Sequence, residues 1–236
     1  MTRQAIDLMF LACNRLRFTQ ESFDTLVRNT DWPLVRELSV YDDGSIDGTR
    51  EWLEAHAAET PVPVRLVWTA FGSPVSAMVH FIETARAPLL GKIDNDTMVP
   101  PGWLAAACGV LDRHPDLHFI GIEAIRPLAA GVVEHSVSLS RCISGLGLYR
   151  CIAFEKSRPV MHARWHGFEE WQAAQSPPLR VGWIDPAMPV FLLDRCPFEP
   201  WRSLTDEYIR RGWQRPWDRY STNSRLCWAM TPIWRR

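Results

Sequence analysis

A short apolar run that ends in carboxylates constrains this chain more than any other feature. Residues 89–93 form the run, and Asp94, Asn95 and Asp96 follow it directly. Such a run before polar residues predicts a buried strand, and ligands of open α/β sheets bind at the carboxyl ends of the strands. Because side chains alternate along a strand, Asp94 and Asp96 can point the same way and offer hard oxygen ligands to Mg²⁺ or Mn²⁺. A polar turn in which one carboxylate caps the next helix explains this stretch equally well.

Predicted strands and helices alternate through the first half of the chain. Strands are expected over residues 5–12, 34–41, 64–68, 89–93 and 118–122, and helices over residues 18–28, 50–58, 73–86 and 100–113. Strands that alternate with helices of about ten residues indicate βαβ units. We therefore expect an α/β fold in which helices flank a mainly parallel sheet.

Composition excludes several classes of protein. A net charge of −1 over 236 residues argues against a protein that coats nucleic acid with its whole surface. Six cysteines without a CxxC pair predict free thiols in a reducing cytoplasm, and not a zinc site or a disulfide scaffold. The apolar stretch 6–12 contains Asp7, is too short to cross a membrane and lacks a signal-peptide cleavage site, so we interpret it as a strand.

A second polar segment, residues 42–49, follows the second predicted strand. Asp42 and Asp43 at the strand end can accept hydrogen bonds from a ribose or a base, and the two glycines of the segment permit a tight turn close to a ligand. Asp47 or Thr49 can cap the helix that follows. Taken alone, the segment is also explained as a glycine-rich turn between a strand and a helix.

Three segments together resemble the inverting, family-two glycosyltransferases with the GT-A fold. Residues 41–49, Y-D-D-G-S-I-D-G-T, resemble the V-D-D-G-S-x-D-G-T segment of that family, and residues 94–96 resemble its Asp-x-Asp metal motif. Residues 13–15, C-N-R, resemble the end of its T-Y-N-R motif. The resemblance covers residues 5–104 well and the next hundred loosely. It implies a GT-A fold, which has a Rossmann-like, mainly parallel sheet.

The resemblance implies how the nucleotide end of a donor would be held. Asn14 and Arg15 would lie by the nucleotide base. Asp43, with Asp42 beside it, would contact the base or the ribose. The implied donor is a nucleotide-diphosphate sugar, with a UDP-sugar as the first candidate.

The resemblance also implies how the phosphates would be held. Asp94 would contact the ribose or a nearby phosphate, with Asn95 in the same donor site. Asp96 would coordinate Mn²⁺ or Mg²⁺, with Asp94 as a second metal ligand. The cation would neutralise the charge of the diphosphate leaving group. Lys92 would also help to hold the donor, or would only extend its ammonium group from the strand to solvent.

The catalytic base is expected in residues 166–171, H-G-F-E-E-W. This stretch resembles the G-x-x-E-D region of the family, whose second acid is the base, although here the pair is Glu169 and Glu170. By register Glu170 is the preferred base and Glu169 the alternative. A carboxylate at this place would remove the proton of the acceptor hydroxyl. Two acids that open an exposed helix are the alternative explanation.

Two weaker patterns lie in the second half. Gly145 and Gly147 resemble the strand before the acceptor site of the family, where small residues let an acceptor sugar approach; an ordinary glycine-containing strand is equally consistent. His162, His166 and Glu170 share one face if their segment is helical, but Gly167 interrupts that face. A dedicated zinc site is therefore the less favoured interpretation.

Composition changes at residue 195, where arginines begin to alternate with tryptophans and tyrosines. We predict one GT-A domain over residues 1–194, with a nucleotide-sugar-binding half (1–104) and an acceptor half (105–194). A basic, tryptophan-rich extension follows over residues 195–236. The extension packs on the domain, binds an anionic membrane surface, or binds nucleic acid through stacking and phosphate contacts.

The sequence therefore predicts a metal-dependent inverting glycosyltransferase. It would move a sugar from a nucleotide-diphosphate donor to a hydroxyl of a glycan, a lipid-linked saccharide or a modified base in DNA. We expect it in the cytoplasm, free or peripheral to the inner face of a membrane. A nucleotidyltransferase is an alternative, but residues 13–17 lack the glycine that its phosphate loop needs. A binding module that holds a sugar nucleotide without turnover is the other alternative.

Overall fold

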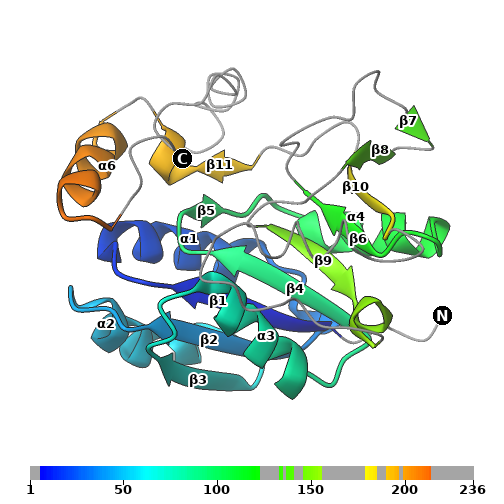
Figure 1. The fold of residues 1–236 in the computed structure, drawn as a ribbon, viewed down its shortest axis with the longest axis horizontal. Coiled ribbons are helices and arrows are strands. Elements are labelled where there is room, and N and C mark those ends of the chain that lie inside the picture. The colour runs from blue at the N-terminus through cyan, green and yellow to red at the C-terminus, as the bar shows by residue number, and fades with distance from the viewer. Residues whose placement is uncertain are drawn as a thin grey trace.

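A nine-stranded sheet forms the centre of the molecule, in the order β3-β2-β1-β4-β9-β6-β10-β8-β7 (Figure 1). The computed structural model describes residues 6–122, 133–134, 137–140, 146–155, 179–184, 190–196 and 199–213. The strands are β1 (Ile6–Ala12), β2 (Val35–Asp43), β3 (Val64–Thr69), β4 (Leu89–Asp94), β6 (Phe119–Gly121), β7 (Val133–Glu134), β8 (Val137–Ser140), β9 (Leu146–Arg150) and β10 (Val181–Ile184). A separate two-stranded sheet pairs β5 (Thr97–Met98) with β11 (Phe191–Leu192).

The predicted α/β fold is confirmed, and its parallel part is the first half of the chain. Strands β3, β2, β1 and β4 are parallel neighbours. Strand β9 then runs antiparallel between β4 and β6, and β10 is parallel to β6. The outer strands β8 and β7 are antiparallel to their neighbours. The sheet is therefore parallel where βαβ units build it and mixed beyond β4.

Helices cover both faces of the sheet because β1 is apolar on both faces. All seven residues of β1 are buried. Leu8 and Phe10 pack with helices α1 (Leu16–Asn29), α2 (Thr49–His56) and α4 (Trp103–Arg113). Met9 and Leu11 point the other way and pack with α3 (Pro74–Thr84). This alternation is the period of two that a buried strand requires, and it produces two helical layers around one sheet (Figure 1).

The close approach of β1, β4 and β9 depends on Gly91. A Cβ added at Gly91 would overlap the Leu8 side chain and would lie 3.1 Å from Cδ2 of Leu148. Gly91 pairs with Leu8 of β1 and with Leu148 of β9. The glycine inside the apolar run is therefore a packing requirement of the central strands.

Asp7, the acid near the amino end of β1, belongs to a polar network with Arg36 of β2. Its buried carboxylate accepts hydrogen bonds from Nε and Nη2 of Arg36 at 2.7 and 2.6 Å. It also accepts from the backbone N–H groups of Arg86 and Ala87 at 2.7 and 3.0 Å. Because four donors satisfy this carboxylate, the strand can bury it.

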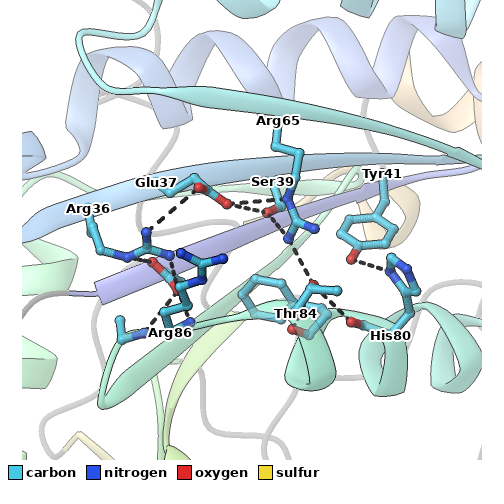
Figure 2. A network of polar contacts seen from close by, with 11 residues as sticks. Arg36, Glu37, Ser39, Tyr41, Arg65, His80, Thr84 and Arg86 are labelled. Atoms are coloured by element: carbon cyan, nitrogen blue, oxygen red, sulfur yellow. Dashed lines mark hydrogen bonds and ion pairs between the residues drawn. The ribbon is translucent and has the colours of Figure 1, made fainter.

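The same network continues between β2, β3 and α3. Arg65 donates through Nη2 to the hydroxyls of Ser39 and Thr84, at 2.8 and 2.9 Å. Its Nε lies 3.2 Å from a carboxylate oxygen of Glu37 (Figure 2). These polar contacts hold the end of α3 against β2 and β3.

A C-terminal helix packs beside the start of α1. Helix α6 (Trp201–Arg210) follows η4 (Leu193–Arg195), a short 3₁₀ helix after β11. Tyr208 of α6 forms a buried cluster with Phe18, Met98 and Leu193, and the rings of Phe18 and Tyr208 meet edge to face at 5.0 Å. Residue 194, the last residue of the expected domain, lies within η4, and the division of the chain at this point stays a prediction. The other short 3₁₀ helices are η1 (Trp32–Leu34), η2 (Ala57–Glu59) and η3 (Cys151–Phe154).

None of the helices in the described segments is both long and apolar enough to span a membrane.

Candidate functional site

The carboxyl ends of β1, β2 and β4 bring the three predicted segments to one edge of the sheet. Ala12 at the end of β1 pairs with Asp42 of β2, and Leu11 pairs with Asp94 of β4. The two acidic segments therefore leave the sheet at the same level, on either side of the loop that follows β1. This edge is where an open α/β sheet binds its ligands.

Asn14 joins the loop after β1 to both acidic segments. Its backbone N–H donates to the hydroxyl of Ser45 at 2.6 Å, and its side-chain oxygen accepts from the N–H of Ile46 at 2.8 Å. Its carbonyl accepts from Nδ2 of Asn95 at 2.9 Å. Asn14 and Arg15 both have left-handed backbones, with φ of 54° and 66°. A non-glycine residue needs firm surroundings to hold this conformation, and these contacts supply them.

Asp47 caps two helices at once. Its Oδ2 accepts from the N–H of Leu16 at the start of α1, at 2.9 Å. Its Oδ1 accepts from the N–H and the hydroxyl of Thr49 at the start of α2, at 3.2 and 2.7 Å. The sequence indicated a cap for α2 alone. The second cap is a tertiary contact that no local pattern indicates.

Asp42 and Asp43 have different surroundings, although they are adjacent. Asp43 accepts through Oδ1 from the hydroxyl of Thr69 at 3.0 Å and from the N–H of Phe71 at 2.5 Å. Its Oδ2 accepts from the N–H of Ser73 at 3.1 Å, so both oxygens order the loop before α3. Asp42 accepts only through Oδ1, from the N–H of Ser45 at 3.0 Å. Its buried Oδ2 has no hydrogen-bond partner among the described residues.

Arg15 lies at the β4 side of the site, against the Asp-x-Asp motif. Its Nη1 donates to Oδ2 of Asp96 at 2.9 Å, and its Nη2 donates to Oδ1 of Asn95 at 2.5 Å. The side chains of Arg15 and Asp96 are only 13% and 17% exposed. Burial works against the charge of Arg15, but nearby carboxylates outweigh burial and raise its pKa. These carboxylates are Asp96, Asp194 and Asp94.

Asp94 forms a second ion pair beside the first, with Nζ of Lys92. Burial and the charge of Asp96 raise the pKa of the Asp94 carboxyl above its ordinary value, whereas the ammonium group of Lys92 acts in the opposite direction. Each acid of the motif is therefore matched by a cation from β4 or from the loop after β1.

Asn95, between the two acids, is directed into the protein. It is 1% exposed, and its Nδ2 donates to the carbonyl of Asn14 and to the hydroxyl of Thr19, both at 2.9 Å. Its backbone N–H donates to the carbonyl of Leu11 at 3.1 Å. With its contact to Arg15, every polar group of the side chain has a protein partner.

A buried polar stripe on α1 holds the segment that carries the motif. The hydroxyl of Ser22 lies 2.6 Å from the carbonyl of Thr97 and 3.1 Å from that of Asp94. Val99 N–H donates to the hydroxyl of Thr25 at 3.0 Å. Sequence reasoning missed these residues, although polar residues at helical spacing on the covered face of a helix are a signal that was available.

Asp194 is a further acid that the fold brings to the site and that sequence reasoning did not select. The N–H of Leu193 donates to the carbonyl of Asp96 at 2.8 Å, which fixes η4 against the motif. Asp194 follows immediately, is buried, and adds to the negative charge around Arg15. The pairing of β5 with β11 produces this approach.

Several predicted residues lie outside the described part of the chain. They are Glu169, Glu170, Gly145, His162 and His166. Most of the basic extension, residues 214–236, is outside it as well.

Gly147 is described, and it lies buried in β9 between Lys92 of β4 and Gly121 of β6. Its acceptor contact stays a prediction.

The described residues contain no cluster of three or more His, Cys, Asp or Glu side chains arranged to hold a metal ion. Asp94 and Asp96 supply hard carboxylate oxygens, which suit Mg²⁺ or Mn²⁺ when substrate phosphates and waters complete the coordination. The residues therefore fit a cation that is bound together with a phosphorylated ligand.

The sequence matches the profile of glycosyl transferase family 2 over residues 9–127, which is about half of the chain. No curated protein sequence matches the chain significantly.

Solved structures with a similar fold include a mannosyltransferase and proteins in complex with a nucleotide sugar or UDP. The S. aureus protein TarS (residues 1–349) is 15% identical with a TM-score of 0.56, over 77% of this chain and 58% of that one. The mannosyltransferase PcManGT from Pyrobaculum calidifontis, in complex with GDP-Man and Mn²⁺, is 16% identical with a TM-score of 0.61, over 86% and 61%. GalNAc-T7 with UDP, GalNAc and Mn²⁺ is 10% identical with a TM-score of 0.58, over 76% and 41%. The chain thus spans less than two thirds of each of these proteins.

Proposed function

The chain belongs to glycosyl transferase family 2, and from this membership we propose that it transfers a sugar from a nucleoside-diphosphate donor to an acceptor hydroxyl, with inversion at the anomeric carbon. The observation that carries the proposal is the joining of three loops at one sheet edge. Arg15 from the loop after β1 contacts Asp96 and Asn95, and Asn14 from the same loop contacts Ser45 and Ile46 of the Asp42–Thr49 segment.

We assign the nucleotide end of the donor to the β2 side of this edge. The buried Oδ2 of Asp42 is an acceptor for an N–H of the base or a hydroxyl of the ribose. Asp43 holds the loop of residues 69–73, so its contribution is to shape this side of the site. Two apolar side chains in these loops, Ile46 and Phe71, are 83% and 43% exposed and offer surfaces to the faces of a base.

We assign the diphosphate to the β4 side, with a divalent cation on Asp96 and Asp94. Mg²⁺ and Mn²⁺ are the candidates because both ions accept carboxylate, phosphate and water oxygens. Such an ion would neutralise the negative charge that develops on the diphosphate as it leaves. Arg15 and Lys92 add two positive charges from the protein at the same place. Proposed donors are UDP-sugars first, then sugars of GDP, TDP and CDP.

The chemical step also needs a catalytic base and a site for the acceptor. The proposal assigns both to the second half of the chain. In the proposal Glu170, or Glu169, takes the proton of the acceptor hydroxyl while its oxygen attacks the anomeric carbon and the nucleoside diphosphate departs. Gly145 and Gly147 line the acceptor side, and the acceptor is a glycan, a lipid-linked saccharide or a modified base in DNA. The thiols of Cys13 and Cys108 are free, which supports the proposal of a reducing, cytoplasmic location.

Thermal unfolding with a panel of donors tests the proposal. UDP-, GDP-, TDP- and CDP-sugars are compared with and without Mn²⁺, in the unchanged protein, in Asp96→Ala and in the control Asp24→Ala, which alters an exposed acid of α1. We expect one base to raise Tm only with metal, and Asp96→Ala to abolish this rise while Asp24→Ala keeps it. No rise with any donor would refute the donor site.

Product analysis separates the proposal from its alternatives. Slow release of a nucleoside diphosphate from the stabilising donor is expected of a glycosyltransferase, and Glu170→Gln should suppress transfer without weakening donor binding. Binding without any release would favour a binding module. Pyrophosphate release from a nucleoside triphosphate and a sugar phosphate would indicate a nucleotidyltransferase.

A further inference from the structure

Arg15 lies among the carboxylates of the site, where a metal cation would also be attracted. Its guanidinium contacts Asp96 at 2.9 Å and Asn95 at 2.5 Å, and Asp94 and Asp194 add negative charge nearby. The resemblance to the family implied a place beside the nucleotide base. The contacts instead put the guanidinium at the Asp-x-Asp motif, on the diphosphate side of the proposed site.

The backbone around Arg15 is fixed, so the guanidinium stays in this region. Asp47 caps the N–H of Leu16 directly after it, and Asn95 holds the carbonyl of Asn14 directly before it. The contact between Nη2 and Asn95 does not involve Asp96. The guanidinium can therefore release one carboxylate and still remain beside the motif.

Two cations cannot use the Asp96 carboxylate at full strength together. A guanidinium at hydrogen-bond distance already neutralises this carboxylate, and its charge repels a second cation that approaches the same oxygens. A phosphate group gives the guanidinium an equivalent partner, because its oxygens match the planar fork of arginine.

We propose that Arg15 and the divalent cation compete for Asp96, and that Arg15 exchanges Asp96 for a phosphate oxygen of the nucleoside diphosphate. The inference rests on the proposed function and adds a role for Arg15 that the motif does not state. Metal alone then binds weakly, because it must displace Arg15. Metal and diphosphate bind cooperatively, because the diphosphate provides the displaced guanidinium with a new partner, and this coupling is reciprocal.

Direct metal binding tests this exchange without any turnover. Free Mn²⁺ is measured by electron paramagnetic resonance during titration of the unchanged protein, of Arg15→Met and of the control Arg17→Met. Met keeps an apolar stem of similar length, and Arg17 is an exposed arginine of α1 that pairs with Glu21. In the unchanged protein the metal must displace the charge-assisted hydrogen bond from Arg15 to Asp96, and Arg15→Met lacks this bond. We therefore expect Arg15→Met to bind Mn²⁺ at least about tenfold more tightly, and Arg17→Met to bind it as the unchanged protein does.

The coupling between metal and nucleotide is the second readout. UDP and GDP are titrated with and without Mn²⁺, and the factor by which metal tightens the nucleotide should fall at least about tenfold in Arg15→Met. Equal Mn²⁺ affinity and equal coupling in Arg15→Met and the unchanged protein would overturn the inference. If the unchanged protein binds none of UDP, GDP, TDP and CDP with Mn²⁺, the proposed function itself fails.

A measurement on the unchanged protein decides the question if Arg15→Met does not fold. The side-chain ¹⁵N–¹H signal of Arg15, assigned with Arg15→Lys, is followed by NMR while Mg²⁺ and UDP or GDP are added. Competition predicts a shift of this signal with Mg²⁺ and nucleotide together, and none for Arg17. An Arg15 signal that does not move at saturation would refute the exchange.

Discussion

Replacing Asn95 with alanine should destabilise the fold, because this buried side chain joins two loops and a helix. Its Oδ1 accepts from Nη2 of Arg15 at 2.5 Å. Its Nδ2 donates to the carbonyl of Asn14 and the hydroxyl of Thr19, both at 2.9 Å. The side chain is buried, so water does not replace these contacts without a rearrangement.

The magnitude follows from the kind of each hydrogen bond. A hydrogen bond to a charged group contributes about 1.5–3 kcal/mol, and a neutral one about 0.5–1.5 kcal/mol. One charged and two neutral bonds are lost in Asn95→Ala, so we expect the free energy of unfolding to fall by about 4 kcal/mol. For a chain of this size, that loss lowers Tm by about 8–16 °C.

Urea unfolding followed by tryptophan fluorescence measures the effect. Asn29→Ala is the matched control, since Nδ2 of Asn29 donates to the carbonyl of Val99 at 2.8 Å and binds the same segment through one neutral bond. We expect a loss of about 1 kcal/mol there. If Asn95→Ala costs no more than Asn29→Ala, Asn95 does not hold the two loops together and our account of the site is wrong.

Two further predictions concern packing and a thiol. Gly91→Ala should destabilise by about 1–3 kcal/mol, because its methyl group overlaps Leu8; Gly109→Ala in α4, where the nearest atom is the flexible end of Arg113 at 3.4 Å, should instead stabilise by about 0.5–1 kcal/mol in the same urea assay. Burial, with two nearby aspartates, raises the pKa of the Cys108 thiol to about 11. At pH 8 only about one thiol in a thousand is then ionised, against about one in ten at the ordinary value of 9.0. Alkylation by iodoacetamide, followed by mass spectrometry, should therefore be about 100-fold slower than in urea; rates within about tenfold of each other would contradict this.

The sequence was a good guide wherever one segment determines its own structure. Five apolar runs predicted five strands, and the runs at residues 6–12 and 89–93 lie in β1 and β4 almost to the residue. These runs are buried on both faces, so hydrophobicity alone specifies them. The glycines at 44 and 48 have positive φ, as the expected tight turn requires.

Contacts between segments that are distant in the chain could not be predicted from the sequence. Asp194 approaches Arg15 because two strands of two residues each, β5 and β11, pair with one another. Strands this short have no periodic pattern. The different surroundings of the Asp42 and Asp43 carboxylates likewise depend on the end of β3 and the loop before α3. Thr69, Phe71 and Ser73 donate to the carboxylate of Asp43, whereas that of Asp42 accepts from Ser45.

The charges at the sheet edge form two ion pairs, and their energetics indicate whether they stabilise the fold or orient the acids. Lys92 pairs with Asp94, and Arg15 pairs with Asp96. Partly buried ion pairs add little net stability, because the loss of hydration offsets the attraction between the charges. Orientation is therefore the better explanation: each cation holds an acid at the edge of the sheet. In the proposed exchange, a metal ion and a diphosphate would take over partners whose charges are already desolvated, which would lower the cost of their joint binding. We accordingly expect the loss of either pair to change metal and diphosphate binding more than folding, whereas the loss of the neutral Asn95 should do the reverse.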